Sequence, residues 1–418
     1  MRLLVINIYF EPTSFGGATV VAEQLAARMN STGRFDVTAL SAAFGAPATT
    51  RTIRYRTRFG FDGFVVSLKN RTSESPLERT KNSKFDDALK QVLDFVRPDV
   101  VHVHCVQELG ASFFDILKSE GTPFAVTVHD FWYFCERQFM IDVTGEFCAQ
   151  RKIDVKRCSM CSPDTNATVQ RTDYLVNQLS KANLVLTPSA YARDMLIANG
   201  LSKDLVRVNK NGVVPPPDDV GLARLDWVGE PIRVGYVGGP GAIKGWNLIV
   251  AALRRAPNLR KRLQIIAVDA GANIGQSWRE ELLHNTADLP VVVVPGYSPN
   301  DIDKAFSQFD AVICPSRWKE TFGLVVREAL VRKKWVIASD AGGLAEDIVD
   351  GENGRILPFP PNRDNVIEAL TELADMVVPP RFDVNNIKSS DDQAREVENW
   401  LCEIIDQDGM LSEKLAIS

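Results

Sequence analysis

The sequence predicts an α/β protein built from two Rossmann-like, parallel-sheet domains that face a cleft between them. Short, nearly continuous apolar runs alternate with segments of helical spacing along the whole chain, and this alternation is interrupted once, by a proline-rich stretch. Continuous apolar runs are typical of strands buried on both faces, and their alternation with helices is typical of doubly wound sheets. We therefore expect domains over residues 1–215 and 230–391.

The first half contains the apolar runs of six expected strands, at residues 2–10, 35–40, 99–104, 123–130, 182–189 and 206–213. Helical spacing predicts helices at 17–33 and 84–97, the second of which ends before Pro98. The segment 213–231, "VVPPPDDVGLARLDWVGEP", is rich in proline and poor in periodicity, and is interpreted as a linker.

The second half repeats the pattern, with expected strands at 232–239, 263–270, 290–296, 310–316, 334–340 and 354–359. A helix is predicted at 244–256. Another, at about 392–418, is a candidate to pack back on the first domain. In such sheets ligands bind beyond the carboxyl ends of the strands, so functional residues are expected there.

Composition excludes several classes of protein. The chain has 418 residues, of which 45% are hydrophobic and 24% charged, and a net charge of −5, which gives no global attraction to nucleic acid. No run approaches 18 apolar residues, and the first apolar run reads as a strand rather than a signal peptide. Seven cysteines, an odd number, fit a reducing compartment. We expect a cytoplasmic protein, with the inner face of the membrane left open as its location.

The segment 317–330, "RWKETFGLVVREAL", places Glu320 and Glu328 with seven residues between them, around Gly323 and an expected helix start. The first N–H groups of a helix bind phosphate well, and carboxylates accept hydrogen bonds from hydroxyls. The segment thus offers a carboxylate, a phosphate-binding helix start and a second carboxylate in a row. A ligand with a sugar, a diphosphate and a ribose in that order would match it. Taken alone, two such glutamates are more often ordinary surface carboxylates.

The surrounding sequence, "PSRWKETFGLVVREALVRKKWVIASDAGGLAEDIVDGENGRILP", resembles the donor-binding segment of family 4 glycosyltransferases (group 1), which have the GT-B fold. "FGGATVVAEQLA", "VTVHDFW" and "GAIKGWNLIVAA" resemble further elements of that family in the same order. The glycine-rich run after the glutamates is matched by Gly342, Gly343, Glu346, Gly351 and Gly354. The resemblance implies a nucleotide-sugar donor and retention of anomeric configuration.

The resemblance also implies roles in the second domain. Glu320 would hold hydroxyls of the transferred sugar, Glu328 the ribose hydroxyls, and Lys244 would add positive charge at the diphosphate. The backbone at the helix start would bind the diphosphate, and its residues are Thr321, Phe322, Gly323, Leu324 and Val325. The family often has an arginine five residues before the lysine; this chain has Gly239, and Arg317 is a candidate substitute.

In the first domain the resemblance implies that Gly16 and Gly17 face the diphosphate. His129 would face the donor sugar and stabilise developing positive charge, while Asp130 orients the loop. An ordinary turn and an ordinary core histidine are the alternatives. Catalysis would be a front-face substitution in which the departing phosphate takes the acceptor proton, without a metal cofactor.

Four cysteines, Cys135, Cys148, Cys158 and Cys161, lie within one short segment that ends in C-x-x-C. Four thiolates suggest a structural zinc, with free or buried thiols as the alternative. From Arg51 to Lys84 basic residues outnumber acidic ones by about three to one. This stretch could contact anionic lipid headgroups or a lipid-linked diphosphate. The alternatives are a mobile solvated loop or a nucleic-acid contact, and the negative net charge of the whole chain disfavours the latter.

These observations together predict a retaining glycosyltransferase. It would move a sugar from a nucleotide-diphosphate sugar to a glycan, glycolipid or lipid-linked acceptor, in bacterial surface polysaccharide or another glycoconjugate. A catalytically silent nucleotide-sugar-binding subunit and another GT-B enzyme, such as a sugar phosphorylase, remain as alternatives.

Overall fold

The computed structural model describes residues 1–14, 16–45, 49–71, 73–217, 230–271, 276–376, 378, 380–384 and 386–417, with side chains up to residue 407. The chain divides into two compact units. Unit 1 contains Met1–Asp142, Ala149–Gly212 and Ser390–Ser418, and unit 2 contains Val143–Cys148 and Val213–Ser389. The short segment Val143–Cys148 thus groups with unit 2, although the sequence assigned it to the first domain. Most of the predicted linker, residues 218–229, lies outside the described residues.

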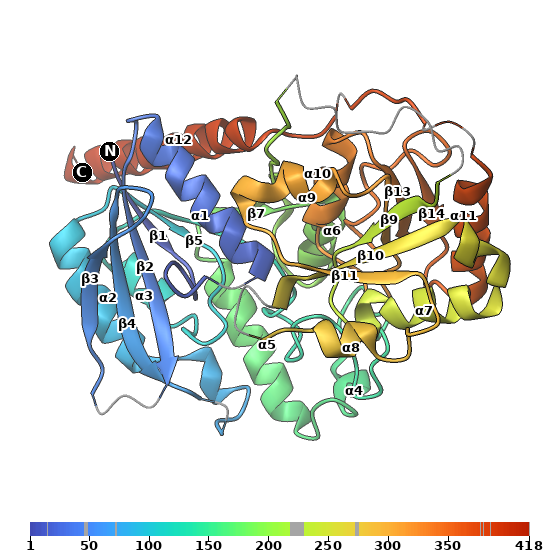
Figure 1. Ribbon diagram of the computed structural model, residues 1–418. Coiled ribbons are helices and arrows are strands. Elements are labelled where there is room, and N and C mark those ends of the chain that lie inside the picture. Colours follow the sequence, from blue (N-terminus) through green and yellow to red (C-terminus); the bar gives the residue numbers. More distant parts are fainter. Residues whose placement is uncertain are drawn as a thin grey trace. The chain divides into compact units, whose positions relative to one another are not determined.

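Unit 1 is built on an eight-stranded sheet in the order β3-β4-β2-β1-β5-β6-β7-β8 (Figure 1). The strands are β1 (Arg2–Ile6), β2 (Asp36–Gly45), β3 (Thr52–Arg56), β4 (Asp62–Lys69), β5 (Val100–Val103), β6 (Phe124–Thr127), β7 (Leu184–Thr187) and β8 (Val206–Val208). All neighbours pair in parallel except β3 and β4. The central strands are fully buried, as their continuous apolar runs predict.

Helices cover the sheet of unit 1. They are α1 (Gly16–Ser31), α2 (Ser83–Val96), α3 (Phe113–Ser119), α4 (Val155–Cys158), α5 (Thr165–Leu179), α6 (Ala190–Ala198) and α12 (Ser390–Ile417). Figure 1 shows α12 beside α1, although they lie at opposite ends of the sequence. Leu25 of α1 and Val397 and Leu401 of α12 share one core with strand residues such as Val5 and Ala125. The last helix therefore packs on the first unit.

Unit 2 has a six-stranded, fully parallel sheet in the order β11-β10-β9-β12-β13-β14. Its strands are β9 (Ile232–Tyr236), β10 (Leu263–Asp269), β11 (Val291–Pro295), β12 (Ala311–Cys314), β13 (Trp335–Ser339) and β14 (Gly354–Leu357). After β9 the chain adds β10 and β11 on one side of β9 within the sheet, and from β12 onward it adds strands on the other side. The topological switch point therefore lies between the neighbouring strands β9 and β12, and ligands bind at such a point in open α/β sheets.

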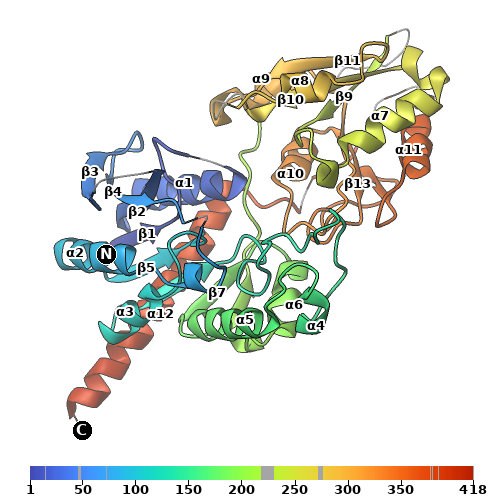
Figure 2. The same ribbon diagram turned by 90° about the horizontal axis from the view of Figure 1, so that it is seen from below.

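The helices of unit 2 cover both faces of its sheet. They are α7 (Trp246–Arg255), α8 (Arg279–Leu283), α9 (Ile302–Phe306), α10 (Leu324–Val331) and α11 (Arg363–Asp375). Figure 2 shows α7 next to α11, and their apolar residues pack with Ile265 and Ala267 of β10. The alternate residues Ile266 and Val268 pack with α9 and α10 on the opposite face. This alternation explains why β10 is apolar from Ile265 to Val268, with side chains buried on both faces.

The basic stretch from Arg51 to Lys84 is not the mobile solvated loop that was one alternative from the sequence. Among its described residues it forms the antiparallel pair β3 and β4 and the start of α2. Arg54 and Arg56 of β3 both pair with Asp62 of β4. Arg58 pairs with Glu11 and Glu23, so much of the positive charge in the strand pair is balanced within unit 1.

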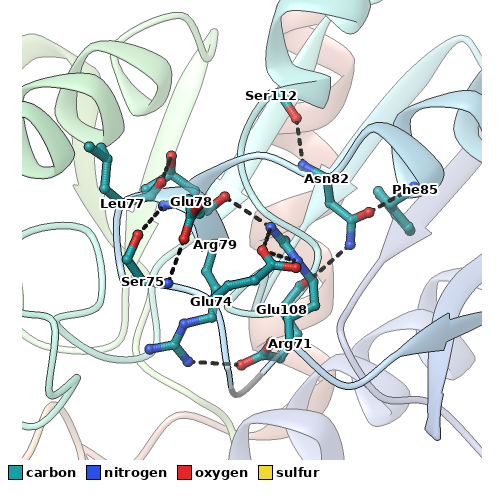
Figure 3. Close-up of polar contacts among 11 residues, drawn as sticks. Arg71, Glu74, Ser75, Leu77, Glu78, Arg79, Asn82, Phe85, Glu108 and Ser112 are labelled. Carbon is teal, nitrogen blue, oxygen red and sulfur yellow. Dashed lines mark hydrogen bonds and ion pairs between the residues drawn. The ribbon is translucent and has the colours of Figure 1, made fainter. Parts of the chain in front are cut away.

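Two later arginines of this stretch, Arg71 and Arg79, also have partners in unit 1, as Figure 3 shows. The Nε of Arg71 donates to Glu74 at 2.9 Å, and its Nη2 donates to the carbonyl oxygen of Glu78 at 2.9 Å. Arg79 lies 3.4 Å from Glu108. The excess of basic residues therefore overstates the charge that this surface offers to a ligand.

Within the described part of the chain, we find no helix with the length and apolar character that crossing a bilayer requires.

Candidate active site

The predicted donor-site residues of unit 2 follow the two strands at its switch point. Lys244 ends a short 3-10 helix, Ala242–Lys244, in the connection after β9. Glu320 lies in the connection after β12, before α10. The backbone N–H of Arg317 donates to the carbonyl oxygen of Ile243 at 2.8 Å, so the two connections are joined directly.

Lys244 and Glu320 form an ion pair, with 2.9 Å between Nζ and Oε1. The Lys244 ammonium also lies 5.3 Å from the centre of the Trp318 ring. Glu320 is nearly buried, and its backbone bonds to Ala341 and Gly343 hold it beside the connection after β13. The residues predicted to hold a phosphate and a sugar are thus brought together.

Gly323 is the N-cap of α10 and has a φ of +94°. A Cβ at this position would lie 2.3 Å from Cδ1 of Leu344, so a side chain would need both a strained backbone and a shift of the Leu344 side chain. Leu324 and Val325 follow in the first turn, whose N–H groups have no acceptor within a helix. Thr321 and Phe322, just before, are buried. The predicted phosphate-binding backbone is therefore the start of a real helix.

Glu328 lies inside α10, a little more than one turn from its start, and is partly buried. Desolvation raises the pKa of its carboxyl group from 4.5 to about 7, although the nearby Arg332 acts to lower it. Near pH 7 the group can therefore be either a hydrogen-bond donor or a charged acceptor. Both forms can bond to hydroxyls.

Gly342 and Glu346, from the glycine-rich run that follows β13, line a hollow of about 480 Å³. Its wall also includes Asp340 and Pro358. Gly342 and Gly351 both have positive φ, which explains glycine at these two positions.

The departure from the family pattern at Gly239 has a structural counterpart. Gly239 has a φ of +71°, and a Cβ there would lie 3.0 Å from the Trp278 ring. Arg317, the candidate substitute, bonds both carboxylate oxygens of Glu146, at 2.6 and 2.9 Å. In this structure its guanidinium is therefore engaged by a carboxylate of the same unit.

In unit 1, Gly16 and Gly17 begin α1, in the connection after β1. Gly16 has a φ of +80°, and an added Cβ would meet no atom within 4 Å. Glycine is required here by the backbone conformation and not by crowding. The end of β1 is joined to that of β5, since Asn7 accepts a hydrogen bond from the N–H of Cys105.

His129 follows β6 and lies next to a histidine that the sequence reasoning missed. Its Nε2 is 2.9 Å from Nδ1 of His104, which follows β5, and the two rings are nearly parallel. Burial lowers the pKa of His129 to about 4, so its imidazole is neutral near pH 7. The alternation "VHVH" before Cys105 was the available signal, because β5 and β6 are adjacent parallel strands.

Asp130 organises the loop after β6. Its carboxylate accepts hydrogen bonds from the backbone N–H of Trp132 at 2.8 Å and from the side chains of Gln107 and Gln138 at 2.6 and 2.7 Å. Desolvation raises its pKa to about 6, and these bonds act to lower it. The predicted loop-orienting role agrees with this geometry.

The four cysteines of the predicted zinc site are divided between the two units. Cys148 groups with unit 2, whereas Cys135, Cys158 and Cys161 belong to unit 1. Across the described residues, no three or more His, Cys, Asp or Glu side chains converge as metal ligands would. The geometry gives the zinc prediction no support, and it stays a prediction.

The two parallel-sheet units, each with its candidate residues beyond strand ends, define a class of fold that solved structures share. Sucrose-phosphate synthase from Thermosynechococcus elongatus has a TM-score of 0.63 at 20% identity, with 100% of both chains covered. Anabaena Alr3699/HepE in complex with UDP-glucose has a TM-score of 0.56 at 16% identity, with 99% of this chain and 100% of that chain covered. The protein has the GT-B fold.

Two family models match the sequence. "Glycosyltransferase Family 4" matches residues 15–215 and "Glycosyl transferases group 1" matches residues 223–377. The chain belongs to this family of group 1, family 4 glycosyltransferases, which confirms the identification made from the glutamate segment.

Among curated relatives, the lipopolysaccharide 1,2-N-acetylglucosaminetransferase of Salmonella typhimurium is 28% identical over 147 residues. That match covers 34% of this chain and 39% of the relative. The chain spans about half the length of the curated relatives it matches.

Proposed function

We propose that this protein is a retaining glycosyltransferase that takes a sugar from a nucleotide-diphosphate sugar. The observation that carries the proposal is the Lys244–Glu320 pair at the switch point of unit 2, next to the start of α10. A cation and a helix N-terminus suit a diphosphate, and a carboxylate suits sugar hydroxyls. In this proposal Glu328 takes the ribose hydroxyls.

The proposed chemistry needs stabilisation of charge rather than a protein nucleophile. Lys244 and the N–H groups from Phe322 to Val325 would stabilise the negative charge that develops on the departing diphosphate. The departing phosphate would take the proton of the acceptor hydroxyl as the new bond forms on the same face of the sugar. His129, neutral because of its low pKa, would add no opposing charge near the developing positive centre.

The donor class is supported by a fold neighbour whose solved structure contains UDP-glucose, and the acceptor class by a relative named for lipopolysaccharide. We propose a glycan, glycolipid or lipid-linked acceptor, in bacterial surface polysaccharide or another glycoconjugate. We further propose that no metal cofactor is required, since Lys244 and the helix start can balance the diphosphate.

A thermal-shift screen across uridine, guanosine and adenosine diphosphate sugars tests the donor class. One nucleotide series is expected to raise the unfolding temperature, because a ligand that binds only the folded state stabilises it. Incubation with the stabilising donor should then release nucleoside diphosphate slowly by hydrolysis. NMR of the sugar product should show the same anomeric configuration, α or β, as in the donor. Stabilisation without any hydrolysis would favour the silent binding subunit, and no stabilisation by any donor would refute the proposal.

We propose that an anionic acceptor anchor or membrane surface is met by the strand β3. Each basic residue near an anionic surface contributes about 1 kcal/mol, and Asp62, Glu11 and Glu23 reduce the available charge here. Replacement by glutamine of four arginines should release the protein from anionic vesicles at low salt: Arg51, Arg54, Arg56 and Arg58.

A matched variant carries the same loss of four charges in unit 2, with glutamine at Arg254, Arg255, Arg260 and Arg262. It should bind the vesicles as wild type does. Equal release of both variants, or no vesicle binding by wild type at low salt, would favour a soluble acceptor over a membrane contact.

A further inference from the structure

Arg327 is a buried arginine inside the candidate donor site that sequence reasoning did not single out. It stands on α10, one residue before Glu328, and its side chain is 1% exposed. Its Nε lies 2.6 Å from Oδ2 of Asp347, which is also buried. Burying an ion pair is costly unless every donor finds an acceptor, so the remaining bonds of this guanidinium are informative.

Those remaining bonds all go to backbone carbonyl oxygens. One terminal nitrogen, Nη1, donates to the carbonyl oxygens of Phe322 at 2.7 Å, of Leu344 at 2.9 Å and, more weakly, of Gly323 at 3.4 Å. The other, Nη2, donates to Gly343 at 2.7 Å. The guanidinium therefore joins two connections, the one that leads into α10 and the one that follows β13.

The same two connections are also joined through their own backbone. The N–H of Glu320 donates to Ala341 at 3.0 Å, and the N–H of Gly343 donates to Glu320 at 2.8 Å. The Arg327 guanidinium lies 4.2 Å from the centre of the Phe322 ring, on the same part of the chain. Arg327 thus fixes the segment between Glu320 and Gly323 from its buried side.

The direction of these bonds determines where the N–H groups point. In a trans peptide the C=O and N–H bonds are antiparallel. When the carbonyl of Phe322 is held toward Arg327, the N–H of Gly323 in the same peptide points away from it. That N–H belongs to the helix start that the proposed function assigns to the diphosphate.

We propose that Arg327 is a positioning residue of the donor site, which holds the backbone before α10 so that its N–H groups face the diphosphate. The inference rests on the proposed function, since it needs a diphosphate as ligand. Lysine would keep the charge next to Asp347 but lacks the planar fork that reaches these backbone carbonyls. Arg327→Lys therefore separates the fork from the charge.

The test compares wild type, Arg327→Lys and a control, Arg233→Lys. Arg233 forms a similar forked pair with the buried Asp310, at 2.8 and 3.1 Å, without bonding the connections of the donor site. The ligand is the nucleoside diphosphate whose base belongs to the donor that wild type binds. Calorimetry gives the affinity of each protein for it, and competition gives the affinity for the nucleoside with the same base.

Arg327→Lys is expected to weaken the diphosphate at least tenfold and to leave the nucleoside within about twofold, because only the phosphate-binding N–H groups move. Arg233→Lys should change neither. If Arg327→Lys does not fold, the double variant Arg327→Gln/Asp347→Asn, which leaves no buried charge unpaired, replaces it with the same expected result.

Equal losses for the diphosphate and the nucleoside would overturn the inference, because a merely structural role affects both. An unchanged diphosphate affinity in the variant would also overturn it while leaving the proposed function intact. If wild type binds no nucleoside diphosphate, the proposed function itself fails, and the inference fails with it.

Discussion

Glu328 should make the stability of this protein depend on pH in a way that its glutamine variant does not. The pKa of its carboxyl group rises from 4.5 to about 7 on folding because of desolvation. A pKa difference of about 2.5 corresponds to about 3 kcal/mol. Because the folded pKa lies above the unfolded one, this stability is fully present below about pH 4.5 and is lost as the pH rises through 7.

Glutamine has the shape of protonated glutamate but cannot ionise, so Glu328→Gln should avoid this loss. The free energy of unfolding of the variant, relative to wild type, should rise by about 2.5 kcal/mol from pH 5 to pH 8. For a domain of 150–250 residues this is a relative shift of roughly 5–10 °C in the midpoint of thermal unfolding.

The measurement is thermal unfolding of wild type, Glu328→Gln and Glu352→Gln at pH 5, 6, 7 and 8. Glu352 is an exposed glutamate of the same unit, so its variant should follow wild type at every pH. A difference between Glu328→Gln and wild type that stays constant across this range would show that Glu328 is not desolvated, and the pKa argument would be wrong.

Three further predictions concern the donor site and metals. Lys244→Met should weaken nucleoside diphosphate about ten- to hundredfold, since a hydrogen bond to a charged group is worth roughly 1.5–3 kcal/mol, and an unchanged affinity by calorimetry would remove Lys244 from the site. Transfer activity should survive a chelator, and its abolition with rescue by a divalent ion would contradict metal-independent catalysis. If the sequence prediction of zinc holds, elemental analysis should find about one zinc per chain in wild type and none after Cys158→Ser/Cys161→Ser; zinc-free wild type would discard it.

The fold was predictable because it depends on strong local patterns. Fully buried parallel strands produce continuous apolar runs, and each of the expected central strands appears within its run. The pair Lys244 and Glu320 could be expected from a resemblance, but their 2.9 Å contact depends on β9 and β12 being neighbours in the sheet, which no local pattern states.

The strands β3 and β4 escaped prediction because their charge pattern was interpreted as a solvated surface. Arg54 and Arg56 are exposed, but they lie on an edge strand and both form ion pairs with Asp62 of β4. His104 and Arg327 escaped for a related reason. A polar residue in an apolar run signals burial with a partner, yet the partners, His129 and Asp347, lie 25 and 20 residues away in sequence.

The glycine at position 239 links the fold to the chemistry of the donor site. Because Gly239 has a positive φ and is close to the Trp278 ring, an arginine there would require both a strained backbone and a displaced tryptophan. In the proposed donor site, the ammonium of Lys244 and the N–H groups at the start of α10 would then supply the positive potential for a diphosphate. A site that depends on backbone N–H groups needs that backbone held rigidly, and the carbonyl bonds of Arg327 provide such a restraint.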